Sequence, residues 1–472
     1  MDATDLAYAG AAEQARMIRE GEVSAREVVT ATLERIDAVQ PRINAYRVVF
    51  AERALAEADQ ADARSGAGQD RPLLGVPVAV KDDMDVAGEV TAWGTAANDV
   101  VKPVDSDVVA RLRQAGAIVV GKTHVPELTV WPFTETLTFG ASRNPWNTDH
   151  TPGGSSGGSG AAVAAGLCGV AVGSDGAGSI RIPAGFNGVF GIKPQRDRIS
   201  LGPDHHDGWN GLTVYGPLSR TVADAAVFLD ATAGGGPQGG FAAALAQEPE
   251  PLRIALSLLA PPPLHKAAKL GDEQRHAIEA TATVLRELGH TVTEREVAYP
   301  RTAFLNVSTR YLAGIAQDLA TLQRPERTEP RTRRMAQLGG LIPAAQLARA
   351  RSGEAALARR INTIFDDADV VLMPGATGEP FRVGELHGRG ALWSLNAAVL
   401  RVPFYGVWNA IGQPAASVPA GFDAKGLPLS AQLCGRAGDE VTLLRLAAQL
   451  EAARPWATRR PPLDARATTA VA

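Results

Sequence analysis

The sequence predicts an α/β protein built around a largely parallel sheet. Two short runs rich in β-branched residues, "GVPVAVKD" (75–82) and "GAIVVGKT" (116–123), lie on either side of a helical segment, "SDVVARLRQA". Strands that alternate with helices are typical of βαβ units, in which the strands are parallel. The chain has 472 residues, of which 45% are hydrophobic and 21% charged, a globular composition that suits one large domain or two.

Helical patterns precede the first strand. The best marked, "SAREVVTATLERIDAVQP", begins with Ser24 as a candidate N-cap and places Glu27 at the capping-box position. Pro41 is expected to follow the end of this helix, because proline disrupts a helix interior. A third helix is expected over about residues 50–63.

The composition of the sequence changes after the glycine-rich stretch "AGGGPQGG" (233–240). The following residues are rich in helix formers and arginine, with one expected strand, "LRIALS" (252–257). Apolar strands return at 368–375, 414–421 and 427–435, before a last helix, "DEVTLLRLAAQLEAA". We therefore predict one domain with a helical insertion, divided into N-terminal helices (1–70), a core (71–235), a helix-rich subdomain (about 236–366) and C-terminal strands with a helix (367–472).

Charge and composition exclude several classes of function. The net charge is −4, and no run of Lys or Arg forms a nucleic-acid-binding stripe, so small neutral substrates are expected and nucleic acid is not. No apolar run approaches the roughly 20 residues of a membrane helix. The N-terminus lacks a signal-peptide pattern, which predicts a cytoplasmic protein. Cys168 and Cys434 lie far apart and the neighbours His205 and His206 are interpreted as loop residues, so no metal site is expected.

Two familiar motif patterns are present without their structural context. "GAIVVGKT" matches the P-loop pattern, but Ala-Ile-Val-Val is typical of a buried strand rather than a phosphate-binding loop. This makes a nucleotide hydrolase the least favoured class, with Lys122 at a strand end. "GGSSG" (153–157) matches the nucleophile-elbow pattern, but the segment before it is a loop rather than a strand.

A second glycine-rich turn, "SDGAGSIRIP" (174–183), carries Ser179. Gly176 and Gly178 allow several backbone N–H groups to point into one space, which suits an anion. A small-residue helix and a buried strand, "GVAVGS" (169–174), connect this turn to "GGSSG". A connection of this length can return the chain to the same end, so Ser155 or Ser156 is expected near Ser179.

A serine nucleophile needs a base, and Lys81 is the candidate. It follows the apolar "GVPVAV", where burial lowers the pKa of a lysine and favours its neutral form. The alternative is a strand-end lysine that pairs with Asp82 or Asp83.

These segments together resemble the amidase signature family of Ser-Ser-Lys hydrolases. The resemblance is carried by "VPVAVKD", "GGSSGGSGAAVAAG" and "GSDGAGSIRIPAGFNGVFGIKP", and extends to "ASRNPWN", "ADVVLMP" and "NAIGQPAASVPAGF" in family order. It covers nearly the full length. It implies an amidase fold, a large mixed β-sheet between layers of helices with a helical insertion or cap.

The resemblance also implies the role of each site residue. Ser179 becomes the nucleophile, Ser155 the bridging serine that follows a cis peptide bond, and Lys81 the base. The oxyanion hole is assigned to the N–H groups of Gly176, Ala177, Gly178 and Ser179. Asp175 and Arg181 are expected to pair and hold the turn, with Ser156 supporting the hydrogen-bond chain. Ala177 stands where many members have glycine, so substrate fit is expected to differ, and no metal or organic cofactor is required.

The substrate is predicted less closely than the chemistry. Trp131 and Phe133 lie in the segment that borders the substrate channel in relatives, and further candidate lining residues are Trp209, Trp393, Phe404, Tyr405 and Trp408. We predict a broad-specificity amidase, a monomer or homodimer, that acts on small-molecule aryl amides, esters or carbamates (a urethanase-like activity).

Two alternatives stay open. The nearer is the glutaminase (A) subunit of an aminoacyl-tRNA amidotransferase, although 300–380 shows no clear amino-acid clamp. The other is a non-enzymatic binding protein on a hydrolase fold, which is disfavoured because Lys81, Ser155 and Ser179 occur together.

Overall fold

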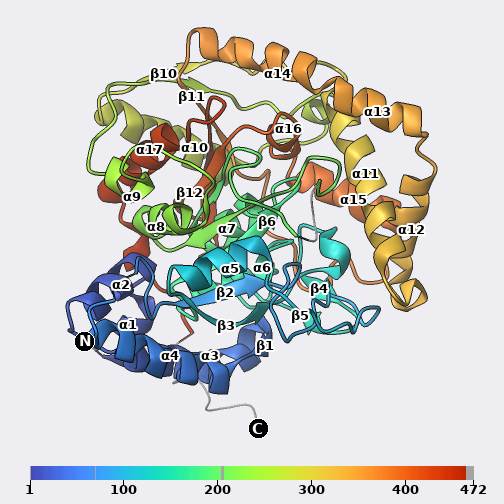
Figure 1. The fold of residues 1–472 in the computed structure, drawn as a ribbon. Helices are drawn as coiled ribbons and strands as arrows, with labels where there is room; N and C mark the ends of the chain where they lie inside the picture. The colour runs from blue at the N-terminus through green and yellow to red at the C-terminus, as the bar shows by residue number, and fades with distance from the viewer. Residues whose placement is uncertain (1, 70, 204–206, 464–472) are drawn as a thin grey trace.

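The computed structural model describes residues 2–69, 71–203 and 207–463, and within them the main sheet has 11 strands (Figure 1). His205 and His206 lie outside the described residues. The strand order is β1-β3-β2-β6-β8-β7-β12-β13-β11-β9-β10. The strands are β1 (Tyr46–Val49), β2 (Pro77–Lys81), β3 (Ile118–Thr123), β6 (Val170–Asp175), β7 (Phe190–Lys193), β8 (Val214–Ser219), β9 (Arg253–Leu256), β10 (Thr291–Glu294), β11 (Val370–Pro374), β12 (Ala415–Phe422) and β13 (Pro428–Cys434). A separate small hairpin pairs β4 (Glu135–Thr136) with β5 (Gly140–Ala141).

Helices cover both faces of this sheet. They are α1 (Ala3–Tyr8), α2 (Ala11–Arg19), α3 (Ala25–Ile43), α4 (Ala51–Gly66), α5 (Asp107–Gln114), α6 (Gly157–Ala164), α7 (Arg181–Asn187), α8 (Val222–Thr232), α9 (Phe241–Ala244), α10 (Asp272–Glu287), α11 (Ala303–Thr321), α12 (Pro330–Gly340), α13 (Ala344–Ser352), α14 (Glu354–Asn362), α15 (Ala391–Arg401), α16 (Gly406–Ala410) and α17 (Glu440–Ala453). None of the helices in the described ranges combines the length and the apolar character that crossing a membrane requires.

The sheet is mixed, as the family resemblance implied. β2 pairs in parallel with β3 and β6, and β9 pairs in parallel with β10 and β11. The remaining neighbours are antiparallel, so the expectation of a largely parallel sheet is wrong outside these two groups. Part of the reason is the short turn between β12 and β13, which can only join antiparallel strands.

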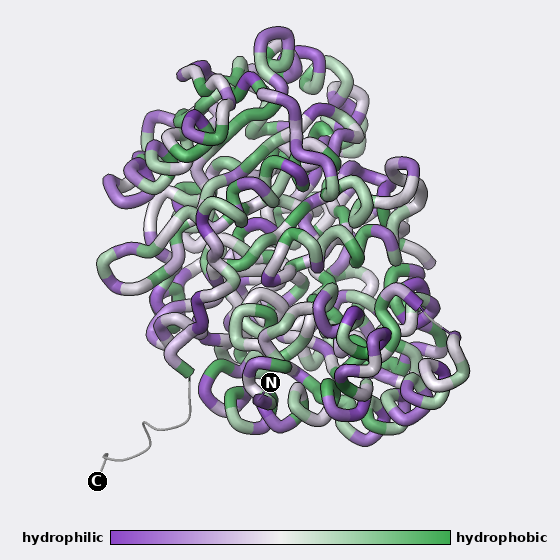
Figure 2. The backbone as a smooth tube through the Cα atoms, turned by 90° about the vertical axis from the view of Figure 1, so that its left-hand side faces the viewer, coloured by the Kyte–Doolittle hydropathy of each residue, from purple (hydrophilic) through white to green (hydrophobic). Residues whose placement is uncertain are grey.

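Alternate residues of a central strand pack into different cores. Val78 and Val80 of β2 belong to the cluster built with α5, α8, α10 and α17, whereas Ala79 belongs to the cluster built with α3, α4 and α6. Successive side chains of a strand point to opposite faces of its sheet. Because helices cover both faces, residues 77–80 of β2 form an apolar run, and Figure 2 shows hydrophobic stretches of the backbone in the middle of the molecule.

The helix-rich section contributes to the main sheet as well as covering it. α11 and α12 lie along one side of the molecule in Figure 1, where α11 packs on α12 and α12 on α15. The predicted strand at 252–257 is confirmed as β9, but β10 was not predicted. In β10 only Val292 is buried, so this edge strand carries almost no hydrophobic pattern.

The capped N-terminal helix is confirmed, and its end is corrected. Ser24 and Glu27 form the predicted capping box at the start of α3. The helix contains Pro41 and ends at Ile43, after which Asn44 adopts a left-handed conformation and its N–H bonds to Gln40 O at 2.8 Å. Pro41 therefore lies within the last turn of the helix, and the left-handed Asn44 ends it.

Candidate active site

The site begins at the carboxyl ends of two parallel neighbours, β2 and β6. Lys81 is the last residue of β2, and Ser174 lies near the end of β6, in a register that pairs Val80 with Val172. The same edge of the sheet therefore carries both side chains. Lys81 Nζ lies 2.6 Å from Ser174 Oγ and 2.7 Å from Ser155 Oγ, and all three residues are buried.

Ser155 lies at this edge of the sheet, in the loop that precedes α6. The peptide bond between Gly154 and Ser155 is cis, as the resemblance implied for the bridging serine. Gly154 passes so close to the chain at Trp131 that a Cβ on it would lie 2.4 Å from the Trp131 carbonyl oxygen. Only glycine allows this approach, which places Ser155 against Lys81.

Ser179 lies on the turn between β6 and α7. Its carbonyl accepts a hydrogen bond from the Ser156 N–H at 3.2 Å, which joins the two glycine-rich turns that the sequence placed together. Ser155 and Ser179 line the same small cavity, of about 30 Å³. Lys81, Ser155 and Ser179 are thus gathered in one place.

Asp175 holds the turn that carries Ser179. Its carboxylate accepts the Gly178 N–H at 2.6 Å and the Ile180 N–H at 3.2 Å. Arg181 donates to the same carboxylate through Nε at 2.9 Å and Nη2 at 3.0 Å. Burial alone would raise the pKa of Asp175, but the Arg181 guanidinium holds it well below its usual range.

This arrangement corrects one part of the predicted oxyanion hole. The Gly178 N–H is engaged by Asp175 and points to the protein's own carboxylate. The N–H groups of Gly176, Ala177 and Ser179 have no acceptor within the described part of the chain. Three of the four predicted donors therefore remain candidates for the oxyanion hole.

Ser156 was expected to take part in the hydrogen-bonded series of side chains around Lys81, but it does not. Its hydroxyl donates to the Ser174 carbonyl at 3.2 Å, so it links backbone segments. Ser174 takes the position instead, because its hydroxyl bridges Lys81 and Asp83, donating to Asp83 Oδ2 at 2.5 Å. Sequence reasoning missed Ser174, and it considered Asp83 only as a partner for a structural lysine. The signal that could have identified them is that β2 and β6 are parallel neighbours, so the residues at their carboxyl ends lie at the same edge of the sheet.

The surroundings of Lys81 favour its neutral form. Burial lowers the pKa of Lys81, and the Asp83 carboxylate, 3.2 Å from Nζ, opposes that shift. The remaining shift is downward, so Lys81 is a stronger candidate for a base than an exposed lysine.

Arg181 also connects the turn to the C-terminal strands. Its guanidinium donates to Gln432 Oε1 on β13 and to Asn409 Oδ1 on α16, both at 2.6 Å. Asn409 in turn donates to the Asp175 carboxylate at 2.8 Å. The sequence offered no signal for Asn409 and Gln432, which lie more than 220 positions away from Arg181.

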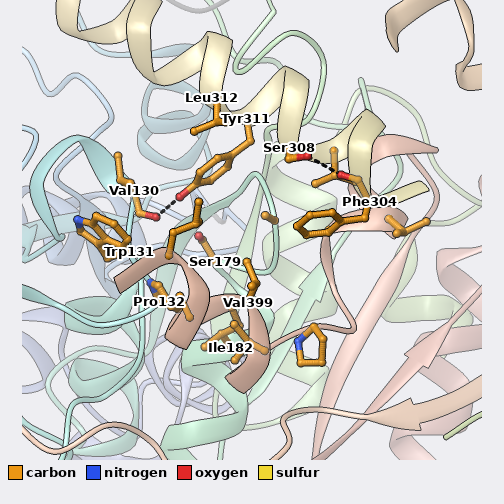
Figure 3. Close-up of a pocket in the computed structure, with 18 of the residues that line it drawn as sticks. Val130, Trp131, Pro132, Ser179, Ile182, Phe304, Ser308, Tyr311, Leu312 and Val399 are labelled. Atoms are coloured by element: carbon orange, nitrogen blue, oxygen red, sulfur yellow. Dashed lines mark hydrogen bonds between the residues drawn. The ribbon is translucent and has the colours of Figure 1, made fainter. Parts of the chain in front are cut away.

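Ser179 also lines a second, larger cavity of about 130 Å³ (Figure 3). In Figure 3 Tyr311 of α11 points towards Val130, whose carbonyl accepts its hydroxyl hydrogen bond. The described lining is almost entirely apolar and contains no charged side chain: Thr129, Val130, Trp131, Pro132, Gly154, Ala177, Ser179, Ile182, Trp209, Pro261, Leu264, Phe304, Val307, Ser308, Tyr311, Leu312, Leu395, Ala398, Val399, Val402, Pro403, Gly406 and Val407.

Only some of the aromatic residues predicted to line the substrate pocket do so. Trp131 and Trp209 line the apolar cavity. Phe133 stacks behind Trp131, with ring centroids 5.6 Å apart. Trp393 does not line this cavity: the residue is 48% exposed, and its ring lies under the Arg389 guanidinium. Of the other aromatic candidates, Phe404, Tyr405 and Trp408 are buried in the core beside the cavity without lining it.

The P-loop match is a strand. Residues 118–123 of the motif form β3, and Lys122 is buried, with Nζ 3.0 Å from the Asp82 carboxylate and 2.8 Å from Thr91 Oγ1. A strand offers no loop of N–H groups for phosphate.

Comparison with known proteins identifies the family of this chain. The family model described as "Amidase" matches residues 27–444. The "Putative amidase AmiB2" of Mycobacterium tuberculosis is 53% identical over 463 residues, covering 98% of this chain and 99% of that protein. The A subunit of a glutamyl-tRNA(Gln) amidotransferase from Synechococcus is 35% identical over 495 residues, covering 95% of this chain and 98% of that protein.

Solved structures show the same likeness over the whole fold. The structure of 6-aminohexanoate cyclic dimer hydrolase complexed with substrate superposes with a TM-score of 0.87 and 32% identity, covering 97% of this chain and 99% of that one. A bacterial aryl acylamidase of the amidase signature family gives a TM-score of 0.83 with 26% identity, covering 95% and 97% of the two chains. The chain therefore belongs to the amidase signature family and is a hydrolase that acts on amide C–N bonds.

Proposed function

We propose that this enzyme hydrolyses small neutral amides that carry an apolar or aryl group, and extends the same acyl chemistry to esters and carbamates. The observation that carries the proposal is the contact of Lys81 with Ser155 beside Ser179, at the wall of an uncharged apolar cavity.

Acylation uses the three side chains in series. Ser179 Oγ attacks the substrate carbonyl carbon while its proton passes to Ser155 and the Ser155 proton passes to neutral Lys81. Negative charge develops on the carbonyl oxygen, where the N–H groups of Gly176, Ala177 and Ser179 stabilise it. Because these donors are held by the turn, they need no reorganisation during the reaction.

Collapse of the tetrahedral intermediate returns the proton. Protonated Lys81 gives a proton to Ser155, and Ser155 gives its own to the leaving nitrogen, so the C–N bond breaks and a neutral amine departs. Water then attacks the acyl-enzyme through the same relay and releases the acid. Ser174, held by Asp83, orients the Lys81 amine throughout.

The apolar cavity supports a preference for neutral apolar acyl groups. Burying a charged group against this lining would leave it without a partner, which is costly, whereas burial of alkyl or aryl surface is favourable. The similarity to an aryl acylamidase is consistent with an aryl substrate.

The glutaminase is the second candidate function, supported by the 35% identity to the amidotransferase protein from Synechococcus. Glutamine carries an α-carboxylate and an α-ammonium group, and the described lining of the apolar cavity offers no opposite charge to hold either group. A monomeric or homodimeric state and a cytoplasmic location stay predictions from the sequence.

The test is release of para-nitrophenol, para-nitroaniline or ammonia from a panel of esters, carbamates, anilides and primary amides, with glutamine included. We expect wild-type turnover to be abolished in Ser179→Ala and lowered about 10²–10⁴-fold in Lys81→Ala. The matched controls are Ser352→Ala and Lys425→Ala, two exposed residues on other parts of the surface. Turnover that survives both active-site substitutions contradicts the mechanism, and activity confined to glutamine favours the glutaminase.

A further inference from the structure

Two arginines hold the carbonyl end of α16, the short helix that carries Asn409. Arg196 Nη2 donates to Asn409 O at 3.0 Å and to Ala410 O at 3.1 Å. Arg310 of α11 donates through Nη1 to Ala410 O, also at 3.1 Å. The last carbonyls of a helix have no partner within it, so these two side chains fix the end of α16.

One carboxylate pairs with both arginines. Glu354, the first residue of α14, accepts from Arg196 Nη1 on Oε1 at 2.6 Å, and its Oε2 lies 3.2 Å from Arg310 Nη1. The two guanidinium groups share Ala410 O as an acceptor, so they lie close enough to repel one another. Burial lowers the pKa of Arg310 to about 10, a shift that the charge of Glu354 opposes and that of Arg196 reinforces. Glu354 therefore keeps both positive groups at the carbonyl end of α16.

The same helix contacts the turn that carries the nucleophile. The Asn409 side chain donates to the Asp175 carbonyl at 2.7 Å and to the Asp175 carboxylate at 2.8 Å. The Asp175 carbonyl and the Gly176 N–H belong to one planar trans peptide group, so they point in opposite directions. The bond from Asn409 therefore sets the direction of the Gly176 N–H, which is one of the three candidate oxyanion donors.

Resting on the proposed function, we propose that Glu354 is a positioning residue for amide hydrolysis. It holds the two arginines on the carbonyl end of α16, and thereby holds Asn409 against the peptide group that carries the Gly176 donor. The reaction then depends on a carboxylate of the helix-rich section that lines neither of the two cavities at Ser179.

The position of Glu354 makes this role accessible to experiment. Its side chain is 27% exposed and lines a surface depression of about 650 Å³ together with Arg196, Arg310 and Arg351. Removal of Glu354 therefore leaves two arginines that a small anion from solution can reach. Arg351 forms an exposed ion pair with Asp207 at the same depression, and such pairs contribute little to stability, so Arg351 offers a matched control.

The first test separates kcat from KM. Glu354→Gln keeps the shape of the side chain but removes its charge. We expect kcat for the primary amide of an apolar acid to fall about tenfold, because a misdirected oxyanion donor weakens stabilisation of the transition state. KM should change less than about twofold, because the apolar cavity is unaltered. Arg351→Gln should keep the wild-type kcat. Rates are expressed per folded molecule, measured by circular dichroism, so a loss of stability alone does not lower kcat.

The second test restores the charge from solution. In Glu354→Ala, sodium acetate should raise kcat at least about threefold over sodium chloride at the same ionic strength, because its carboxylate can bind between the two arginines. Wild type and Arg351→Gln are measured in the same series, so that an effect of acetate at the active site is corrected for.

The third test asks whether the effect passes through Asn409. If it does, Glu354→Gln should lower kcat less than about twofold in an Asn409→Ala background, because the link to the turn is already missing. Two residues that act independently would instead lower kcat by the product of their single effects.

The outcomes separate this inference from the function on which it rests. A wild-type enzyme that hydrolyses no amide, ester or carbamate contradicts the proposed function, and the positioning role with it. With an active wild type, the positioning role alone is overturned by an unchanged kcat in Glu354→Gln, by a loss in Glu354→Ala that acetate does not reverse, or by independent effects at Glu354 and Asn409. If Glu354→Ala does not fold, Glu354→Gln alone and with Asn409→Ala decides the question.

Discussion

At the scale of single residues, the pKa of the proposed base, Lys81, depends on the neighbouring Asp83 carboxylate. Lys81 is buried, and its Nζ contacts the hydroxyl groups of Ser155 and Ser174. Its Nζ also lies 3.2 Å from Asp83 Oδ2. Burial favours neutral Lys81, and the negative charge of Asp83 favours protonated Lys81. The pKa of Lys81 is the balance of these two opposing effects.

This balance predicts a pH effect of Asp83→Asn. The proposed mechanism requires neutral Lys81, so we expect kcat/KM for a neutral amide to fall as the pH drops through the pKa of Lys81. Removal of the carboxylate lowers that pKa further, so the rising limb of the profile should move to lower pH by about one unit or more. The pH profile of kcat/KM measures this, with the exposed Asp59→Asn as control. A limb that stays in place or moves to higher pH contradicts the assignment of Lys81 as the base.

At the scale of elements, the turn between β6 and α7 is built for one backbone conformation. Gly178 has a φ of +119°, and a Cβ on it would lie 2.7 Å from Tyr405 Cβ. Asp175 collects the Gly178 and Ile180 N–H groups, and Arg181 neutralises the carboxylate. The turn is therefore held both by its own hydrogen bonds and by the packing of the segment that precedes α16.

We predict that Gly178→Ala disrupts this turn. The positive φ and the overlap with Tyr405 should together lower the free energy of unfolding by about 1–3 kcal/mol, and displacement of the oxyanion donors should lower kcat. Urea denaturation and steady-state kinetics measure the two effects. Gly66→Ala is the matched control, because open space surrounds Gly66 at the end of α4. Equal stability and activity of both variants would show that the turn has no such requirement.

At the scale of the whole molecule, the apolar cavity exists only because distant segments meet. The segment 129–132 after β3, the helix α11 from the helix-rich section and the region from α15 to α16 form its walls around Ser179. The proposed catalytic groups lie at the sheet edge and on the two glycine-rich turns beside it, and most of the cavity lining comes from helices and the segments next to them. Substrate preference can therefore change without a change in the catalytic groups.

Trp131→Leu tests this division. The substitution enlarges the cavity wall, so the ratio of kcat/KM for bulky over small acyl groups should rise about tenfold. Trp146→Leu is the control, since Trp146 packs on Phe422, with ring centroids 4.6 Å apart, and does not line the cavity. Kinetics on amides of acetic and phenylbutyric acid measure the ratio. An unchanged ratio in Trp131→Leu contradicts the assignment of this cavity to the acyl group.

The extent of prediction from sequence follows from the range of each interaction. The strand containing Lys81, the capped helix at Ser24 and the two glycine-rich turns are local patterns, and the structure confirms these elements. The end of α3 beyond Pro41 was not predicted, because it depends on the cap at Asn44. The edge strand β10 was not predicted either, because it depends on pairing with β9 and has almost no hydrophobic periodicity. Trp393 was placed in the cavity because aromatic composition says nothing about which way a helix turns.

By itself, the sequence determined the α/β character of the chain, the gathering of Ser155 and Ser179 on two joined turns, and Lys81 as a lysine at the end of a buried strand. These features are written in hydrophobic runs, glycines and short spacings along one stretch of chain. Only the tertiary structure decided that Ser174 and Asp83 surround Lys81 and that the Gly178 N–H donates to the Asp175 carboxylate. It also decided that Ser179 lines two cavities. The physical reason is that most of these contacts require the edges of neighbouring strands and helices far apart in the chain to meet, and no local pattern records such distances.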